Sequence, residues 1–166
     1  MRFFIIAILF NVVSACKFSA IYAEHDGAAS DLPEIFINYD FNEHQLEQKI
    51  VLRNIIKNLR QGLNSTENQT NLFRLDLGRI NITDNAVNIG RDAEVSEFRL
   101  AVALSARLWH GEESLLNENF RAAVNYNVEG AYYASQAVKQ EMLLDLSEQL
   151  YRNLQAKLIL ELKDYE

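Results

Sequence analysis

Residues that build enzyme and metal sites are scarce in this sequence. It has one cysteine and three histidines among 166 residues. His25, His44 and His110 lie far apart, and none has another His or a Cys at the spacing of a metal site. The sequence also lacks a glycine-rich phosphate loop and a Gly-x-Ser-x-Gly nucleophile motif. We therefore expect a protein that is not an enzyme and needs neither a metal nor a cofactor.

Proline, glycine and positive charge are also in short supply. One proline and six glycines leave little room for long disordered tracts. The 16 Lys and Arg residues are outnumbered by 23 Asp and Glu residues, which gives a formal net charge of −7. An acidic chain of this kind argues against non-specific binding to nucleic acid and against broad docking on an anionic membrane surface.

The N-terminal segment is strongly apolar. Residues 3–13 follow Arg2 and contain a single polar side chain, Asn11. About 11 residues make roughly 16 Å of helix, which is too short for a hydrocarbon core of ~30 Å but typical of a secretory signal peptide. The run ends in Val-Ser-Ala-Cys at residues 13–16, which resembles the bacterial lipobox. The alternative is an ordinary signal peptide followed by an incidental cysteine.

Cleavage at this motif predicts how the chain is divided. Residues 1–15 are the lipoprotein signal peptide, residues 16–33 are a tether that carries lipid on Cys16, and residues 34–166 are a single α+β domain. Loss of Arg2 changes the net charge from −7 to −8. Cys16 is the only cysteine, so it cannot form an internal disulfide, and its position suits lipidation.

The spacing of apolar residues predicts an α+β fold. We expect a four-stranded, largely antiparallel sheet with two helices packed on one face, in the order βαβββα. The strands are predicted at residues 34–39, 72–82, 97–109 and 116–126, and the helices from a cap at Asp40 or Asn42 to Leu63 and from after Gly130 to about Lys163. Loops are expected at residues 64–71 and 84–93 and a hairpin turn at residues 110–113.

The alternation of apolar and polar residues reverses phase at one point in the second strand. Leu75 and Leu77 lie on one face before Gly78, whereas Ile80 and Ile82 continue that face after it. One extra residue in the strand explains the change, so the sequence predicts a β-bulge at Gly78.

The face of the sheet that points away from the helices carries arginines. Arg74, Arg99, Arg107 and Arg121 all fall at polar positions of the predicted strands. They either keep the surface soluble or meet a protein or an anionic lipid, since the guanidinium group suits carboxylates and phosphates.

Four stretches resemble one bacterial family. They are Cys-Lys-Phe at residues 16–18 with Ile-Tyr-Ala at 21–23, the alternating strands at 72–77 and 98–108, and Asn-Tyr-Asn-Val at 125–128 followed by Tyr-Tyr-Ala-Ser at 132–135. Together they resemble the lipopolysaccharide-assembly lipoprotein LptE (rare lipoprotein B-like) family. That family's fold, two helices on a four-stranded sheet, agrees with the pattern of apolar residues.

The resemblance implies a function without catalysis. Such a lipoprotein is anchored in the outer membrane through its lipidated cysteine, faces the periplasm and sits as a plug inside the β-barrel of the lipopolysaccharide translocon. It helps that barrel to assemble and takes part in inserting lipopolysaccharide at the cell surface. The implied partners are the barrel, lipopolysaccharide and the membrane, with no nucleic acid.

Candidate contact residues follow from this hypothesis. Arg99, Arg107 and Trp109 are predicted to anchor the sheet on the barrel, because interfaces often centre on arginine and aromatic side chains. Arg91, in the loop predicted at residues 84–93, is a candidate contact for a lipopolysaccharide phosphate. The alternatives are a periplasmic lipoprotein subunit of an ABC-type lipid-transport system and an unrecognised envelope hydrolase.

Overall fold

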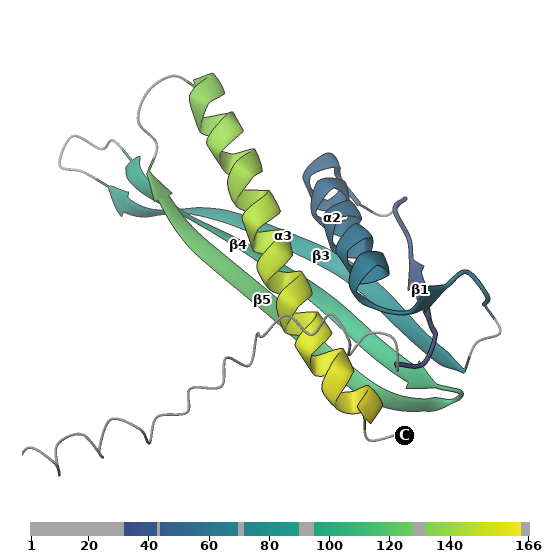
Figure 1. The fold of residues 1–166 in the computed structure, drawn as a ribbon. Helices are drawn as coiled ribbons and strands as arrows, with labels where there is room; N and C mark the ends of the chain where they lie inside the picture. Colours follow the sequence, from purple (N-terminus) through teal and green to yellow (C-terminus); the bar gives the residue numbers. More distant parts are fainter. Residues whose placement is uncertain (1–31, 43, 70–71, 90–94, 128–131, 164–166) are drawn as a thin grey trace, which may run out of the picture.

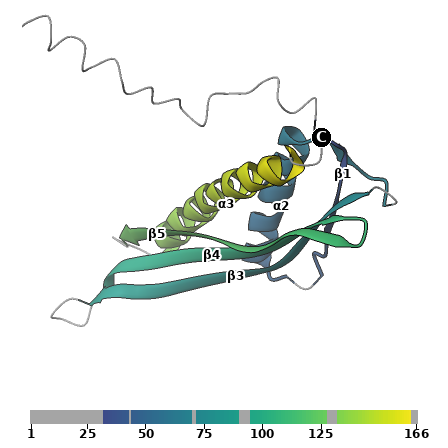
Figure 2. The ribbon, with the colours of Figure 1, turned by 90° about the horizontal axis from the view of Figure 1, so that it is seen from below.

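The computed structural model describes residues 32–42, 44–69, 72–89, 95–127 and 132–163. One sheet has the strand order β2-β1-β3-β4-β5, and both helices lie on the same side of it (Figures 1 and 2). The predicted α+β class is therefore confirmed. In chain order the elements are β1 (Ile35–Tyr39), α2 (Leu46–Gly62), β2 (Ser65–Thr66), β3 (Phe73–Ile89), β4 (Val95–His110), β5 (Glu113–Asn127) and α3 (Tyr132–Lys163).

The sheet has five strands, so the prediction of four was wrong by one. The additional strand, β2, lies in the segment predicted as a polar loop and pairs in parallel with β1 over two residues. The Ile35 amide also donates to the Asn64 carbonyl at 2.9 Å, just before β2 begins. Two residues are too few to produce an alternating pattern, so the sequence carries no periodic signal for this strand.

The pairing of the other strands combines both directions. β1 runs parallel to β3, whereas β3, β4 and β5 form an antiparallel meander. The hairpin turn between β4 and β5 falls at Gly111 and Glu112, as predicted, and Gly111 adopts a positive φ of 60° that glycine tolerates without strain.

The loop predicted at residues 84–93 is wrong for its first half. β3 continues to Ile89 and pairs with β4 through Asp84–Leu100, Asn85–Arg99 and Ala86–Phe98. Asn and Asp favour turns locally, but pairing along β4 outweighs that preference. Arg91 lies outside the described residues.

The predicted β-bulge at Gly78 is confirmed. The register changes between the pairs Leu77–Ala106 and Ile80–Leu104, so Gly78 and Arg79 together oppose the single residue Ser105. A Cβ atom built on Gly78 would lie 2.3 Å from the Ser105 hydroxyl oxygen, so a larger residue would displace that side chain.

Side chains just before and within the first turn of α2 bond to the main chain of β3 directly after the bulge. The Ile80 amide donates to His44 Nε2 at 3.3 Å, and Gln48 Nε2 donates to the Ile80 carbonyl at 2.8 Å. Both main-chain groups of Ile80 point away from β4 and are satisfied by these side chains.

The predicted cap of α2 was wrong. The cap is Gln45, whose amide donates to the Gln48 side chain at 2.7 Å, rather than Asp40 or Asn42. Asp40 instead accepts from the Asn42 amide at 2.7 Å and so stabilises a turn before the helix.

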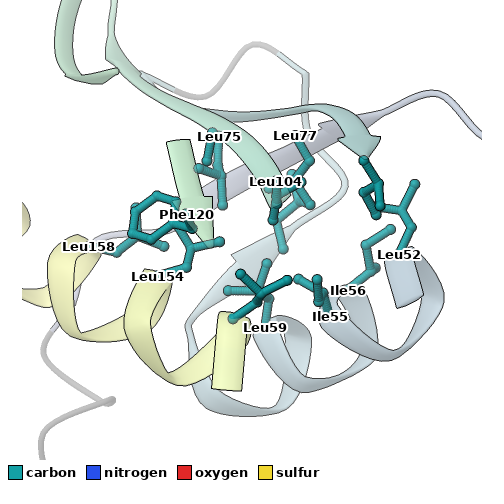
Figure 3. Packing of buried hydrophobic residues seen from close by; sticks show 14 of the residues in the cluster. Leu52, Ile55, Ile56, Leu59, Leu75, Leu77, Leu104, Phe120, Leu154 and Leu158 are labelled. Carbon is teal, nitrogen blue, oxygen red and sulfur yellow. The ribbon is translucent and has the colours of Figure 1, made fainter. Parts of the chain in front are cut away.

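The core lies between the sheet and the two helices (Figure 3). The sheet contributes inward-facing side chains such as Leu104, which is fully buried. Five leucines at helical spacing form a stripe along α3, and each of the five is fully buried: Leu143, Leu146, Leu150, Leu154 and Leu158.

Four polar side chains join both helices to the far half of the sheet. Lys139 of α3 lies 3.1 Å from the Glu47 carboxylate of α2 and 3.3 Å from the Asp84 carboxylate of β3. The Tyr126 hydroxyl of β5 reaches both Asp84 carboxylate oxygens at 3.1 and 3.0 Å. We call Glu47, Asp84, Tyr126 and Lys139 the polar clasp.

The polar clasp predicts a loss of stability at high pH. Burial, the hydrogen bond to Asp84 and the negative charges of Asp84 and Glu47 raise the pKa of Tyr126 from 10.0 to about 12. The folded protein therefore keeps the phenolic proton at pH values where the unfolded chain has lost it. Its free energy of unfolding should fall as the pH rises from about 10 to about 12.

The measurement is urea unfolding of the wild type and of Tyr126→Phe across this pH window. The variant lacks the phenolic proton, so its stability should depend less on pH. Parallel profiles for the two proteins would contradict the raised pKa of Tyr126.

Candidate functional site

The outer face of the sheet, which points away from both helices, holds a trough of about 740 Å³. Its floor is made of small side chains, namely Ala101, Ala103, Ser105 and Ala123. Three arginines, Arg79, Arg99 and Arg121, line it together with Asn81, Thr83 and Asn119. We call this hollow the arginine trough.

Strand register brings the three arginines together from three different strands. Arg121 of β5 lies in the row of Asn81 and Ala103, and Arg99 of β4 lies between Asn85 and Asn125. Arg79 comes from β3 and reaches this face because the β-bulge places it opposite Ser105.

The charge of the arginine trough is opposite to that of the chain. None of the described residues that line it is acidic, although the whole sequence carries −7. Within the part of the chain that the structure describes, Arg79, Arg99 and Arg121 form no ion pair. A guanidinium group donates paired hydrogen bonds to carboxylates and phosphates, so the trough can bind an anionic group over an apolar floor.

Arg107 and Trp109 belong to a separate cluster near the β4–β5 turn. The Trp109 indole N–H donates to Asp76 at 2.7 Å, and Asp76 also accepts from the Asn38 side chain at 2.8 Å. The guanidinium carbons of Arg74 and Arg107 lie 5.5 and 5.2 Å from the centre of the Trp109 ring. These residues satisfy one another through hydrogen bonds and cation–π contacts.

The structure thus divides the three residues predicted as partner anchors. Arg99 lies in the arginine trough, whereas Arg107 and Trp109 lie outside it. The alternation of residues predicted Arg121 on the outer face correctly, but the sequence analysis did not include Arg79 there. The reversal of phase at Gly78 was the available signal for Arg79, because an inserted residue redirects the side chains beside it.

A second hollow, of about 360 Å³, lies beside β1 and β2. Its lining includes both Arg60 and Glu67, so it has no single sign of charge. The arginine trough is the stronger candidate because its charged side chains all have the same sign.

The other predicted site residues are not placed by the structure. Cys16 and Arg91 both lie outside the described residues. Among the residues that are described, no group of three His, Cys, Asp or Glu side chains is arranged to hold a metal ion.

Solved structures share this fold. Rare lipoprotein B from Shewanella oneidensis has a TM-score of 0.57 at 11% identity, covering 76% of this chain and 96% of its own. The fold is that of rare lipoprotein B. The fold is also similar to that of lipoprotein B from Nitrosomonas europaea, with a TM-score of 0.59 at 12% identity over 76% of this chain and 82% of its own. A lipoprotein from Caulobacter crescentus CB15 is similar with a TM-score of 0.55 at 17% identity over 84% of this chain and 98% of its own.

Comparisons of the amino-acid sequence give no match of their own. No protein-family model matches it, and no curated protein does. The resemblance to the rare lipoprotein B-like family is confirmed by the structural neighbours, at the level of the fold. Neither described helix combines the length and the apolar character needed to cross a membrane.

Proposed function

We propose that this chain is an outer-membrane lipoprotein that plugs the β-barrel of the lipopolysaccharide translocon and helps it to assemble. Lipid on Cys16 would attach it to the membrane from the periplasmic side, and it would take part in inserting lipopolysaccharide at the cell surface without catalysing a reaction. The rare lipoprotein B fold and the lipobox-like leader support the proposal.

The arginine trough is the observation that carries this proposal. Both helices cover one face of the sheet, so the opposite face of β3, β4 and β5 is available to a partner (Figure 2). The interior of an outer-membrane barrel is polar, and a polar wall can present carboxylates to the three arginines. Arg99 is the proposed anchor within the trough, and Arg91 remains a predicted lipopolysaccharide contact.

The test compares Arg99→Glu with Arg107→Glu in the full-length protein. Reversal of the Arg99 charge places a carboxylate in the trough, and we expect recovery of the co-purified barrel to fall by about 30-fold, as for an interface hot spot of about 2 kcal/mol. Arg107→Glu should have a smaller effect because Arg107 lies outside the trough and stacks on Trp109. Barrel recovery is quantified by mass spectrometry after affinity purification from solubilised membranes.

The controls separate binding from folding and identify the partner. Both substitutions are at exposed positions, so both variants should melt close to the wild type. Equal barrel recovery for Arg99→Glu and the wild type would move the contact away from the trough. Recovery of an inner-membrane transport complex in place of a barrel, with the wild-type chain, would overturn the proposed function.

A further inference from the structure

The free edge of β5 borders the arginine trough. β5 is the last strand in the sheet order, and no other described strand pairs with its outer side. Arg121 and Ala123 belong to this strand and also line the trough. A polypeptide that paired with β5 would therefore lie beside the arginines.

The alternation of hydrogen bonds identifies which residues of β5 face that edge. The main chain of Ile80 bonds to the side chains of His44 and Gln48, so it does not bond to its β4 partner Leu104. The amide and the carbonyl of one residue in an antiparallel sheet point to the same side. Those of Leu104 therefore point away from β3 and bond to its β5 partner, Phe120. Even-numbered residues of β5 bond to β4, and the amides and carbonyls of odd-numbered residues point to the open edge. The odd-numbered residues at the open edge include Asn117, Asn119, Arg121, Ala123 and Asn125.

This edge has few of the features that usually prevent strand addition, and Glu118 and Arg121 are its only charged residues between 116 and 127. Residues 116–127 contain no proline and no lysine, and their register with β4 is unbroken. On the opposite side of the sheet the edge is covered as far as Ile80, and β3 beyond Ile80 has no described strand on its outer side. β2 pairs with the outer side of β1, and His44 and Gln48 bond to Ile80 on β3.

The side chains along β5 indicate what kind of strand fits. The outer face carries Asn119 and Arg121, whereas the helix side carries the apolar residues Phe120 and Ala122, which are buried, and Val124, which is partly buried. A strand added here would place polar or acidic side chains beside Arg121 and apolar ones on the other side. Strands of outer-membrane barrels alternate between polar and apolar side chains in this way.

We infer that the free edge of β5 receives an edge strand of the partner barrel before that barrel closes. The inference rests on the proposed function and gives a mechanism for the assistance in assembly. The added strand pairs with the open main-chain groups of β5, and an acidic side chain on it pairs with Arg121. Closure of the barrel then exchanges these hydrogen bonds for those of the closing seam.

The first experiment compares Asn117→Pro with Asn117→Ala in the full-length chain. Asn117 faces the open edge and does not line the arginine trough. Proline removes one amide at the open edge without removing a bond to β4, and alanine keeps the amide. The barrel is pulse-labelled in cells that express each variant, and its folded form is followed by its faster migration on semi-native gels. We expect closure to slow by about fivefold with Asn117→Pro, as for one lost hydrogen bond, and to be unchanged with Asn117→Ala.

The second experiment does not introduce a proline into β5. A benzophenone amino acid at Asn117, on the edge, is compared with one at Arg152, an exposed residue of α3. Mass spectrometry should identify a crosslink from position 117 to a terminal strand of the barrel early after the pulse, and this crosslink should disappear as the barrel closes. Position 152 should give no such crosslink.

The outcomes distinguish this inference from the proposed function. If the wild type co-purifies the barrel and Arg99→Glu lowers its recovery, but closure is equally fast with Asn117→Pro, the proposed function stands and the strand exchange is overturned. Crosslinks from position 117 to a second copy of this chain, or to the closed barrel only, would also overturn it. Failure of the wild type to recover any barrel overturns both.

Discussion

Replacing Leu104 with aspartate is expected to unfold the domain. Leu104 is fully buried at the middle of β4, in the cluster between the sheet and the helices (Figure 3). A carboxylate at this position would have no partner, and an uncompensated buried charge costs about 3–5 kcal/mol. That is comparable with the total stability of a domain of this size, about 5–15 kcal/mol. Urea unfolding followed by circular dichroism measures the loss.

The matched control is Ala103→Asp, one residue earlier in the same strand. Ala103 points to the arginine trough and lies opposite Arg121, so the new carboxylate stays near water and near a cation. We expect its free energy of unfolding to stay within about 1 kcal/mol of the wild type. If Leu104→Asp melted like the wild type and Ala103→Asp did not, the strand would face the opposite way.

Replacing Cys16 with serine is expected to abolish lipidation of the protein. The motif at residues 13–16 predicts that the thiol of Cys16 carries lipid, and stable anchoring needs more than one acyl chain or a second hydrophobic signal. Serine cannot form the thioether, so the variant should incorporate no acyl groups. Metabolic labelling with a palmitate analogue, followed by immunoprecipitation, measures the change.

The control for this prediction is Lys17→Ser, which alters the adjacent residue and keeps the thiol. It should incorporate the palmitate label to the same extent as the wild type. Intact mass of the wild type should show acyl groups on Cys16 and the absence of residues 1–15. An unmodified Cys16 with the leader still attached would contradict the prediction.

The parts of the fold that were predicted from the sequence are those with a local pattern. The inward face of β4 and the leucine stripe of α3 follow from periods of two and 3.6 residues, which one segment displays by itself. The bulge at Gly78 was also found this way, because it shifts the phase of a single strand. The turn at Gly111 follows from its position between two alternating segments.

The parts that were missed depend on contacts between segments. Residues 84–89 contain turn-forming Asn and Asp, and only their pairing with β4 makes them a strand. Asp40 and Gln45 can both cap a helix, and the turn that uses Asp40 decides between them. The same holds for the candidate site. Alternation along β4 predicts that Arg99 and Arg107 share one face. It does not predict the hydrogen bond from Trp109 to Asp76, because that bond joins β4 to β3.

The bulge at Gly78 also marks where the sheet changes width. Before it, β3 is flanked by β1 and β4, and β1 ends opposite Leu77. After it, beyond Ile80, the sheet is a ribbon of three strands that extends past β1 (Figure 1). No described strand lies beside β3 in this ribbon, so its curvature depends on the polar clasp that ties it to both helices. The arginine trough spans the change of width, from Arg79 at the bulge to Arg99 in the ribbon, so the shape that a partner meets is set on the opposite face of the sheet.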